Sequence, residues 1–158
     1  MIEFVNIGLD LLEKIFPYIG KVDFNISDVE MQLDVPRESD GEGGFIHGSR
    51  GSFSVEIINK KNTNVILEDI HCVAYHDKTV IQDNIRCNDK ATYHKVAMRS
   101  AYAKVPSVSI PGNGIVSFEI IIHSNNDLSQ CNKLTLSYLR GRNRREVTVY
   151  ERLEEKNE

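Results

Sequence analysis

The segment Val108–His123, with the sequence VSIPGNGIVSFEIIIH, decides the fold class of this chain. Its second half alternates strictly, and one side of the extended chain carries only large apolar residues: Val116, Phe118, Ile120 and Ile122. This period of two predicts a strand with one face in a core. The preceding Pro111-Gly112-Asn113-Gly114 predicts a tight turn, because proline presets φ while glycine and asparagine tolerate positive φ.

The same alternation recurs in both directions from this segment. We predict strands within the ranges 22–35, 52–59, 65–75, 79–81, 134–138 and 147–149. A change of register at Ser27-Asp28 indicates a bulge in the first range. Polar connections at 60–64, 76–78 and 140–145 predict hairpin turns. About seven to nine short strands without βαβ alternation predict a two-sheet antiparallel sandwich.

Two regions lack this alternation. Residues 36–51, PRESDGEGGFIHGSRG, are polar and glycine-rich and predict a surface loop suited to binding. The loop has no phosphate signature, because Ser49-Arg50 replaces the Lys-Ser/Thr of a P-loop and Ile46 replaces the last glycine of G-x-G-x-x-G. In residues 82–104, Asp89 is placed to cap a helix through 90–103. An irregular crossover with one edge strand fits the same residues.

An amphipathic helix is predicted ahead of the β domain, within residues 1–20. Its apolar positions repeat at intervals of three and four residues up to Pro17, and the interaction face consists of Ile2, Val5, Leu9, Leu12 and Phe16. Packing on the β domain, self-association or contact with a partner helix, and attachment to a membrane surface are all compatible with this face. Its polar side is acidic, whereas interfacial helices carry bases, so we expect no membrane contact.

Length and charge set the broad class of the protein. We expect an N-terminal helix at 1–20, one β-sandwich domain at 21–152 and a charged tail at 153–158. The net charge of −4 disfavours nucleic acid as a partner, although residues 133–158 carry more bases than acids. The first residues do not resemble a secretion signal, and the three cysteines are scattered. We therefore expect a cytoplasmic protein with reduced thiols.

The sharpest functional candidate is the hairpin tip RGRNRR, with Arg140, Arg142, Arg144 and Arg145. Guanidinium groups at this density suit phosphate groups. A solvated tip, contact with a protein, and binding of phosphate or nucleic acid are the alternatives. The acidic neighbours and the lack of interleaved aromatic residues count against nucleic acid.

Motifs for metal binding and catalysis are lacking. The five histidines and three cysteines show neither C-x-x-C nor H-x-x-x-H spacing, so we expect no metal site and no cofactor. The nucleophile motif G-x-S-x-G is absent, and the His76-Asp77 pair lies in a predicted turn. We therefore expect that the protein is not an enzyme.

The order of a strand at 53–58, an asparagine-rich turn at 59–64, a strand at 65–75 and a proline–glycine turn within 108–120 carries a resemblance to known domains. Over about residues 52–152 the chain resembles the immunoglobulin-like and fibronectin-type-III-like domains of bacterial proteins. It differs from antibody domains, because it contains no tryptophan for the Cys…Trp…Cys core. The resemblance implies an immunoglobulin-like sandwich used as a binding or spacer module, without catalytic residues to transfer.

These observations lead to one functional expectation and one alternative. We expect a non-enzymatic β-sandwich module that acts through contact with a protein partner or through self-association of its first helix. The alternative is phosphate or nucleic-acid binding through residues 140–145.

Overall fold

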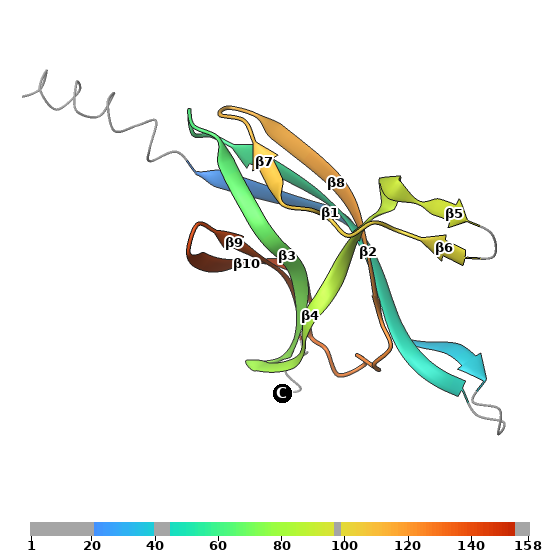
Figure 1. Cartoon of the computed structure of the whole chain (residues 1–158). Helices are drawn as coiled ribbons and strands as arrows, with labels where there is room; N and C mark the ends of the chain where they lie inside the picture. Colours follow the sequence, from blue (N-terminus) through green and yellow to red (C-terminus); the bar gives the residue numbers. More distant parts are fainter. Residues whose placement is uncertain (1–20, 40–44, 97–98, 154–158) are drawn as a thin grey trace, which may run out of the picture.

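The computed structural model describes residues 21–39, 45–96 and 99–153, which form mainly antiparallel β structure (Figure 1). The mainly β fold class is therefore confirmed. The helix predicted within 1–20 lies outside the described residues, as does the tail beyond Leu153.

Ten strands and one short helical turn follow one another along the described chain. They are β1 (Val22–Ser39), β2 (Phe45–Asn59), β3 (Val65–His76), β4 (Thr79–Asp89), η1 (Lys90–Thr92), β5 (His94–Val96), β6 (Arg99–Ala101), β7 (Val108–Ile110), β8 (Ile115–Ser124), β9 (Lys133–Arg140) and β10 (Asn143–Glu151). The hydrogen-bonded order is β1-β2-β8-β4-β3-β9-β10, with β7 paired to the start of β3 and with β5–β6 as a separate hairpin.

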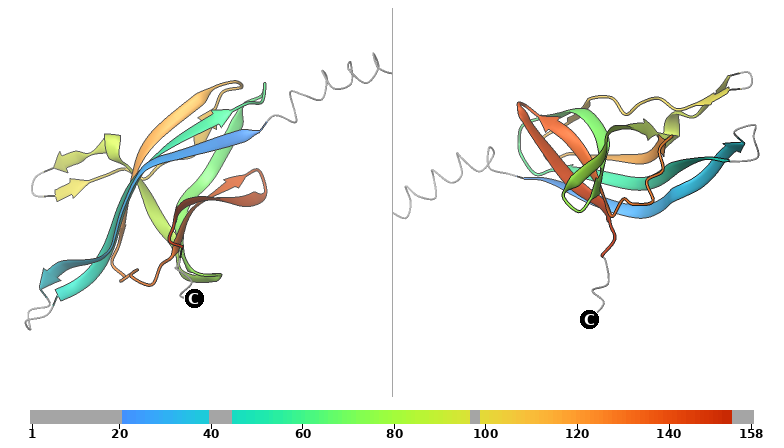
Figure 2. Two further views of the ribbon diagram at one scale, coloured as in Figure 1. Left: turned by 180° about the vertical axis from the view of Figure 1, so that it is seen from behind. Right: turned by 90° about the horizontal axis from the view of Figure 1, so that it is seen from below.

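The sheet is nearly closed, like a barrel, because its two edge strands β1 and β10 approach each other (Figure 2). An aromatic pair supports this closure. The rings of Phe24 on β1 and Tyr138 on β9 stack with their centroids 4.9 Å apart. The apolar faces of the strands therefore point into one shared interior.

β4 joins the two halves of the sheet by changing its partner along its length. Residues 79–86 run beside β3, whereas residues 87–89 pair with β8. An extra residue on β4 coincides with Asn84, whose φ of +57° is left-handed. Asp28 in β1 and Asp69 in β3 also have left-handed φ angles, and each lies at a bulge where its strand has one extra residue. Asparagine and aspartate tolerate this conformation, and such bulges bend a strand and increase its twist.

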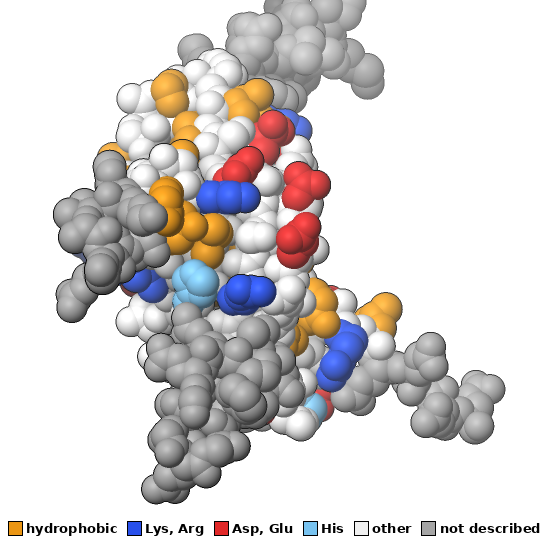
Figure 3. All heavy atoms as spheres, turned by 90° about the vertical axis from the view of Figure 1, so that its right-hand side faces the viewer, with side chains coloured by type: hydrophobic (Ala, Val, Ile, Leu, Met, Phe, Trp, Pro, Cys, Tyr) orange, Lys and Arg blue, Asp and Glu red, His pale blue; other side chains and the backbone are white. Residues whose placement is uncertain are grey.

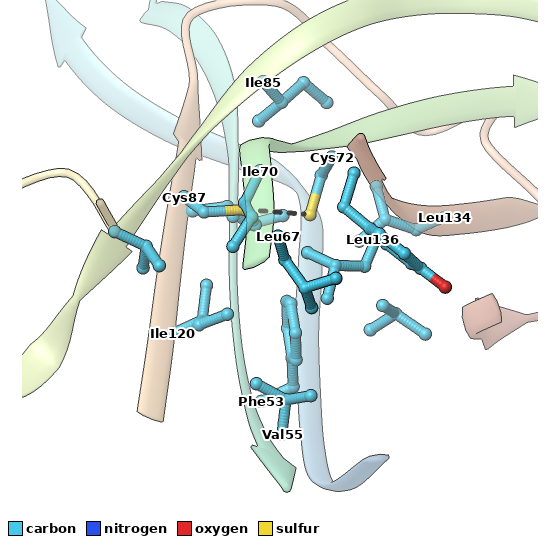
Figure 4. Packing of buried hydrophobic residues seen from close by; sticks show 14 of the residues in the cluster. Phe53, Val55, Leu67, Ile70, Cys72, Ile85, Cys87, Ile120, Leu134 and Leu136 are labelled. Carbon is cyan, nitrogen blue, oxygen red and sulfur yellow. Dashed lines mark hydrogen bonds between the residues drawn. The ribbon is translucent and has the colours of Figure 1, made fainter. Parts of the chain in front are cut away.

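The core is formed by the residues that alternate inward on β2, β3, β8 and β9 (Figure 4). Cys72 on β3 is fully buried among them. The half-buried Val116 and Phe118 of β8 pack against the edge of the same cluster. The largest fully buried apolar side chains are Phe53, Ile57, Leu67, Ile85, Ile110, Ile120, Leu134 and Leu136.

The glycine-rich segment 36–51 is largely not a loop, and that prediction was wrong. β1 continues to Ser39 and β2 starts at Phe45, so the two strands run past the core as a two-stranded arm (Figure 1). The backbone N–H and C=O groups of each strand are paired with those of the other, so the arm can form without a core beneath it. At Gly51 in β2 the Met31 side chain lies directly against the backbone, so a Cβ there would require that side chain to move.

Of the two alternatives for residues 82–104, the described residues favour the crossover, because 82–96 and 99–104 show no helix longer than one turn. β4 extends to Asp89, whose carboxylate accepts a hydrogen bond from the Ala91 amide at 3.0 Å and caps the single turn η1. The cap was placed correctly, but the chain then turns into the short β5–β6 hairpin (Figure 1). The bulge expected at Ser27-Asp28 and the turns at 60–64 and 76–78 are confirmed.

One buried amide ties two turns at the same end of the sheet. The Asn59 side chain is fully buried, and its Nδ2 donates to the carbonyl oxygens of Thr63 at 2.9 Å, Ile110 at 3.1 Å and Pro111 at 3.1 Å. Its Oδ1 accepts from the Lys61 amide at 3.0 Å. Asn59 therefore joins the β2–β3 turn to the β7–β8 turn.

Replacing Asn59 by leucine is expected to lower the free energy of unfolding by roughly 2–4 kcal/mol, because the buried Ile110 carbonyl loses its donor. Urea unfolding measures this change. The matched control is Asn62→Ala, because Asn62 also bonds across these turns, to the Asn113 side chain, but is exposed. We expect this substitution to change the free energy of unfolding by no more than about 0.5 kcal/mol. Equal effects of the two substitutions would contradict the bridging role of Asn59.

Candidate functional site

The four arginines of the predicted binding tip are divided between the two faces of the β9–β10 hairpin. Gly141, with φ of +62°, and Arg142 form the turn. Arg144 and Arg145 are consecutive residues of β10, so their side chains leave on opposite faces. Arg144 is the Cα partner of Leu139 on β9, and Arg145 is the partner of Tyr138.

Arg144 is bound to the bulge in β3. Its Nη1 donates to the Asp69 carbonyl oxygen at 3.0 Å, and its Nη2 forms an ion pair with the Asp69 carboxylate. The hydrogen bond from Arg144 lowers the pKa of Asp69 below its usual value. Arg144 is therefore a cross-strand brace between β10 and β3, which leaves Arg140, Arg142 and Arg145 for any external ligand.

Arg140 and Arg145 act on the phenol of Tyr138 instead. Burial raises the pKa of Tyr138, and the two positive charges oppose that rise. The structure thus brings two of the predicted arginines to Tyr138 and one to Asp69. The four side chains do not converge on one phosphate-sized position.

The Arg144–Asp69 pair belongs to a polar hollow of about 390 Å³ on the outer face of β3, β4, β9 and β10. His71, 7% exposed, has Nδ1 3.1 Å from the Asp69 carbonyl oxygen and Nε2 3.3 Å from Asp83 Oδ1. Tyr75 donates a hydrogen bond of 2.6 Å to Glu146 on β10. Burial first, and then this bond, raise the pKa of Tyr75 to about 12.

These groups are satisfied by one another. The carboxylates of Asp69 and Glu146 bond Arg144 and Tyr75 respectively, and the imidazole of His71 faces oxygen atoms at both nitrogens. A phenol with a pKa of about 12 stays protonated at neutral pH. These pairs link β3 to β4 and β10 on the outer face of the sheet.

A second hollow, of about 320 Å³, has a different character. It lies on the outer face of β1, β2 and β8, where Arg50 and His123 are cross-strand partners and Ser52 is the partner of Ile121. Tyr102, which directly follows β6, lines the same hollow. We call this hollow the arm groove, because it lies on the strands that continue into the β1–β2 arm. Its lining residues are Glu30, Gln32, Arg50, Gly51, Ser52, Tyr102, Ile121 and His123.

The root of the β5–β6 hairpin is held firmly on β4. The Asp89 amide donates to the Ala103 carbonyl oxygen at 2.9 Å, and the Ala103 amide donates to Thr92 Oγ1 at 2.9 Å. The Tyr102 ring packs on Tyr93 with their centroids 5.2 Å apart. These contacts set the position of Tyr102 before any ligand binds.

The arm groove combines the polar side chains of Arg50 and His123 with the apolar surface of Tyr102 and Ile121, and Glu30 also lines it. Figure 3 shows one face of the molecule, on which apolar, basic and histidine side chains lie near one another with acidic side chains beside them. Arg50 Nε donates to the Gln32 side-chain oxygen at 2.7 Å, which orients the guanidinium along the face. The groove can therefore accept a carboxylate next to an apolar group.

Sequence reasoning did not find the arm groove. Arg50 lay in the segment interpreted as a loop, and Tyr102 lay in the segment that showed no alternation. His123 was noted only as the end of the core strand. The outward positions of β8 give a partial signal, because they change along the strand from Ser117 and Glu119 to Ile121 and His123.

Comparisons with models of known protein families, with curated proteins and with solved structures find no match. Within the described ranges, no cluster of three or more histidine, cysteine, aspartate or glutamate side chains is arranged to hold a metal ion. In the same part of the chain, no helix has the length and apolar character needed to cross a bilayer.

Replacing Arg144 by glutamine is expected to lower the free energy of unfolding at pH 7 by about 0.5–1 kcal/mol, the range for a half-exposed ion pair. Folding lowers the pKa of Asp69, so the ion pair stabilises the folded protein at pH values above 3.8, the ordinary pKa of the carboxyl group. This stabilisation is lost as the pH falls through the lowered pKa of the folded state. The difference between the two chains should therefore shrink below about pH 3.8 in urea unfolding.

The control for this measurement is Arg142→Gln, which removes the same charge from the exposed turn. We expect its effect to be smaller than that of Arg144→Gln at pH 7. A difference between wild type and Arg144→Gln that stays constant from pH 7 to pH 2 would contradict the role assigned to the Asp69 carboxylate.

Proposed function

We propose that this protein is a non-enzymatic β-sandwich module that binds a partner protein in the arm groove. The observation that supports the proposal is the convergence of Arg50, Tyr102, Ile121 and His123 on one open hollow. Tyrosine and arginine are enriched at the centres of protein interfaces, where they supply most of the binding free energy. Tyr102 is also ordered in advance, which lowers the entropy cost of binding.

The chemistry of the groove defines the kind of partner that we propose. Arg50 and His123 lie opposite each other across β2 and β8 and favour a carboxylate, whereas Tyr102 and Ile121 offer apolar surface. Glu30 at the same hollow disfavours a second acidic group on that side. The partner is therefore a protein segment with one acidic side chain next to an apolar one.

The proposal includes the finer description of the fold as a two-layer immunoglobulin-like sandwich. One layer would contain β1, β2, β8 and the end of β4, and the other would contain β7, β3, β9, β10 and the start of β4. The change of partner along β4 supports this division, since strands that switch sheets form the corners of such folds.

The segment 1–20 is proposed as a second contact element. The support is its sequence alone, in which Ile2, Val5, Leu9, Leu12 and Phe16 share one helical face. Self-association through this face would bring two arm grooves into one particle, which strengthens binding to a partner with two acceptor segments.

Selection from a library of random peptides displayed on phage tests the groove. With the full-length protein as bait, we expect enrichment of peptides with an acidic residue beside an aromatic or aliphatic one. Tyr102→Ala and Arg50→Gln should each weaken binding of a selected peptide by at least tenfold, as measured by calorimetry. Tyr102→Phe should retain binding, because it keeps the ring.

Arg142→Gln is the matched control, because it removes an equal charge far along the sheet at the β9–β10 turn. Its affinity for the selected peptide should equal that of the unchanged protein. If no such peptides are enriched, or if Tyr102→Ala and Arg50→Gln bind them as well as wild type, the arm groove is not the contact site.

The alternative, phosphate or nucleic-acid binding at the hairpin tip, is tested with Arg140, Arg142 and Arg145 changed together to glutamine. Arg144 is left in place because it braces β3. We expect the elution of the protein from heparin to stay at the same low salt concentration after this change. Earlier elution would support the alternative. In that case the slope of log K against log salt concentration should also become shallower by about 0.9 for each lost phosphate contact.

A further inference from the structure

Two buried cysteines lie in contact inside the sheet. The sulfur atoms of Cys72 on β3 and Cys87 on β4 are 3.4 Å apart, and both residues are fully buried (Figure 4). Cys131 is a separate thiol, whose Sγ donates to the Lys133 carbonyl oxygen at 3.2 Å. None of these thiols takes part in the arm groove or in the polar hollow.

The two cysteines mark the place where β4 changes its partner. Cys72 is the Cα partner of Ile85 on β4, whereas Cys87, two residues further on, is already the partner of Ile122 on β8. A disulfide bond measures about 2.05 Å, so the sulfurs must close by about 1.4 Å from their present 3.4 Å. Closing this distance requires rotation of the two side chains and a shift of β4.

We propose that Cys72 and Cys87 are a site of reversible oxidation, at which a peroxide joins them in an intrachain disulfide. One sulfur attacks an oxygen of hydrogen peroxide, the O–O bond breaks, and a sulfenic acid and water form. The other sulfur attacks the sulfenic sulfur, and the hydroxyl leaves as water with the second thiol proton. Two thiols and one peroxide thus give one disulfide and two waters.

The reaction is slow in the closed fold. The hydrogen bond with Cys87 and then burial raise the pKa of Cys72 well above the ordinary thiol value, so little thiolate is present at neutral pH. Oxidation therefore requires local opening of β4. That strand is suited to opening, because three residue pairs join it to β8 and the bulge at Asn84 interrupts its pairing with β3.

Peptide mapping of the full-length chain tests the site directly. After treatment with hydrogen peroxide, the denatured protein should retain one titratable thiol of the original three. Mass spectrometry should find the peptide with Cys72 joined to the peptide with Cys87, and dithiothreitol should separate them. Recovery of both peptides as sulfinic acids, as free thiols, or joined to Cys131 would overturn the proposal.

Variants give a second readout. Cys131→Ala should form the same cross-link at the same rate, and Cys87→Ala should form none. The wild-type map does not depend on the folding of either variant.

In hydrogen exchange, the amides of residues 85–88 should exchange more slowly in the oxidised chain than in the reduced chain, since the cross-link restrains the opening of β4. Equal exchange in the two forms would contradict the proposal that oxidation proceeds through opening of β4.

Discussion

The partner exchange along β4 is the constraint on which the rest of the structure depends. A single strand must bond β3 first and β8 afterwards, so the chain has to bend sharply within a few residues. The left-handed Asn84 supplies one extra residue at that bend, and Asp28 and Asp69 supply the same device in β1 and β3. With these bends the sheet curves until β1 approaches β10, and its apolar faces meet in one interior.

Near-closure also explains where the two outer hollows lie. Within the curved part of the sheet, inward side chains fill the core, while the outer face of β3, β4, β9 and β10 is occupied by the network of Asp69, His71, Tyr75, Glu146 and Arg144. Strand segments beyond the curve have no second layer to cover them. The arm groove lies at such a place, beside the root of the β5–β6 hairpin and on the strands that continue into the β1–β2 arm.

Strands that alternate over a core are predictable from the sequence, as the segment 115–123 and the inward Phe53 and Cys72 show. The β1–β2 arm was missed because its strands are stabilised by each other, which leaves no apolar alternation to detect. The role of Arg144 was missed because its partner Asp69 is 75 residues away in the chain. Tyr102 has no signal of its own, since three-residue strands are too short to show a period.

The bulges of β1 carry a consequence for how copies of this protein meet. Three register shifts interrupt the pairing of β1 with β2, and Pro36, which has no amide hydrogen, lies between two of them. Beyond Ser27, an incoming strand therefore finds no long regular row of donors and acceptors along the outer margin of β1. The chain can carry a long, exposed hairpin and still resist growth into fibrils by edge-to-edge stacking.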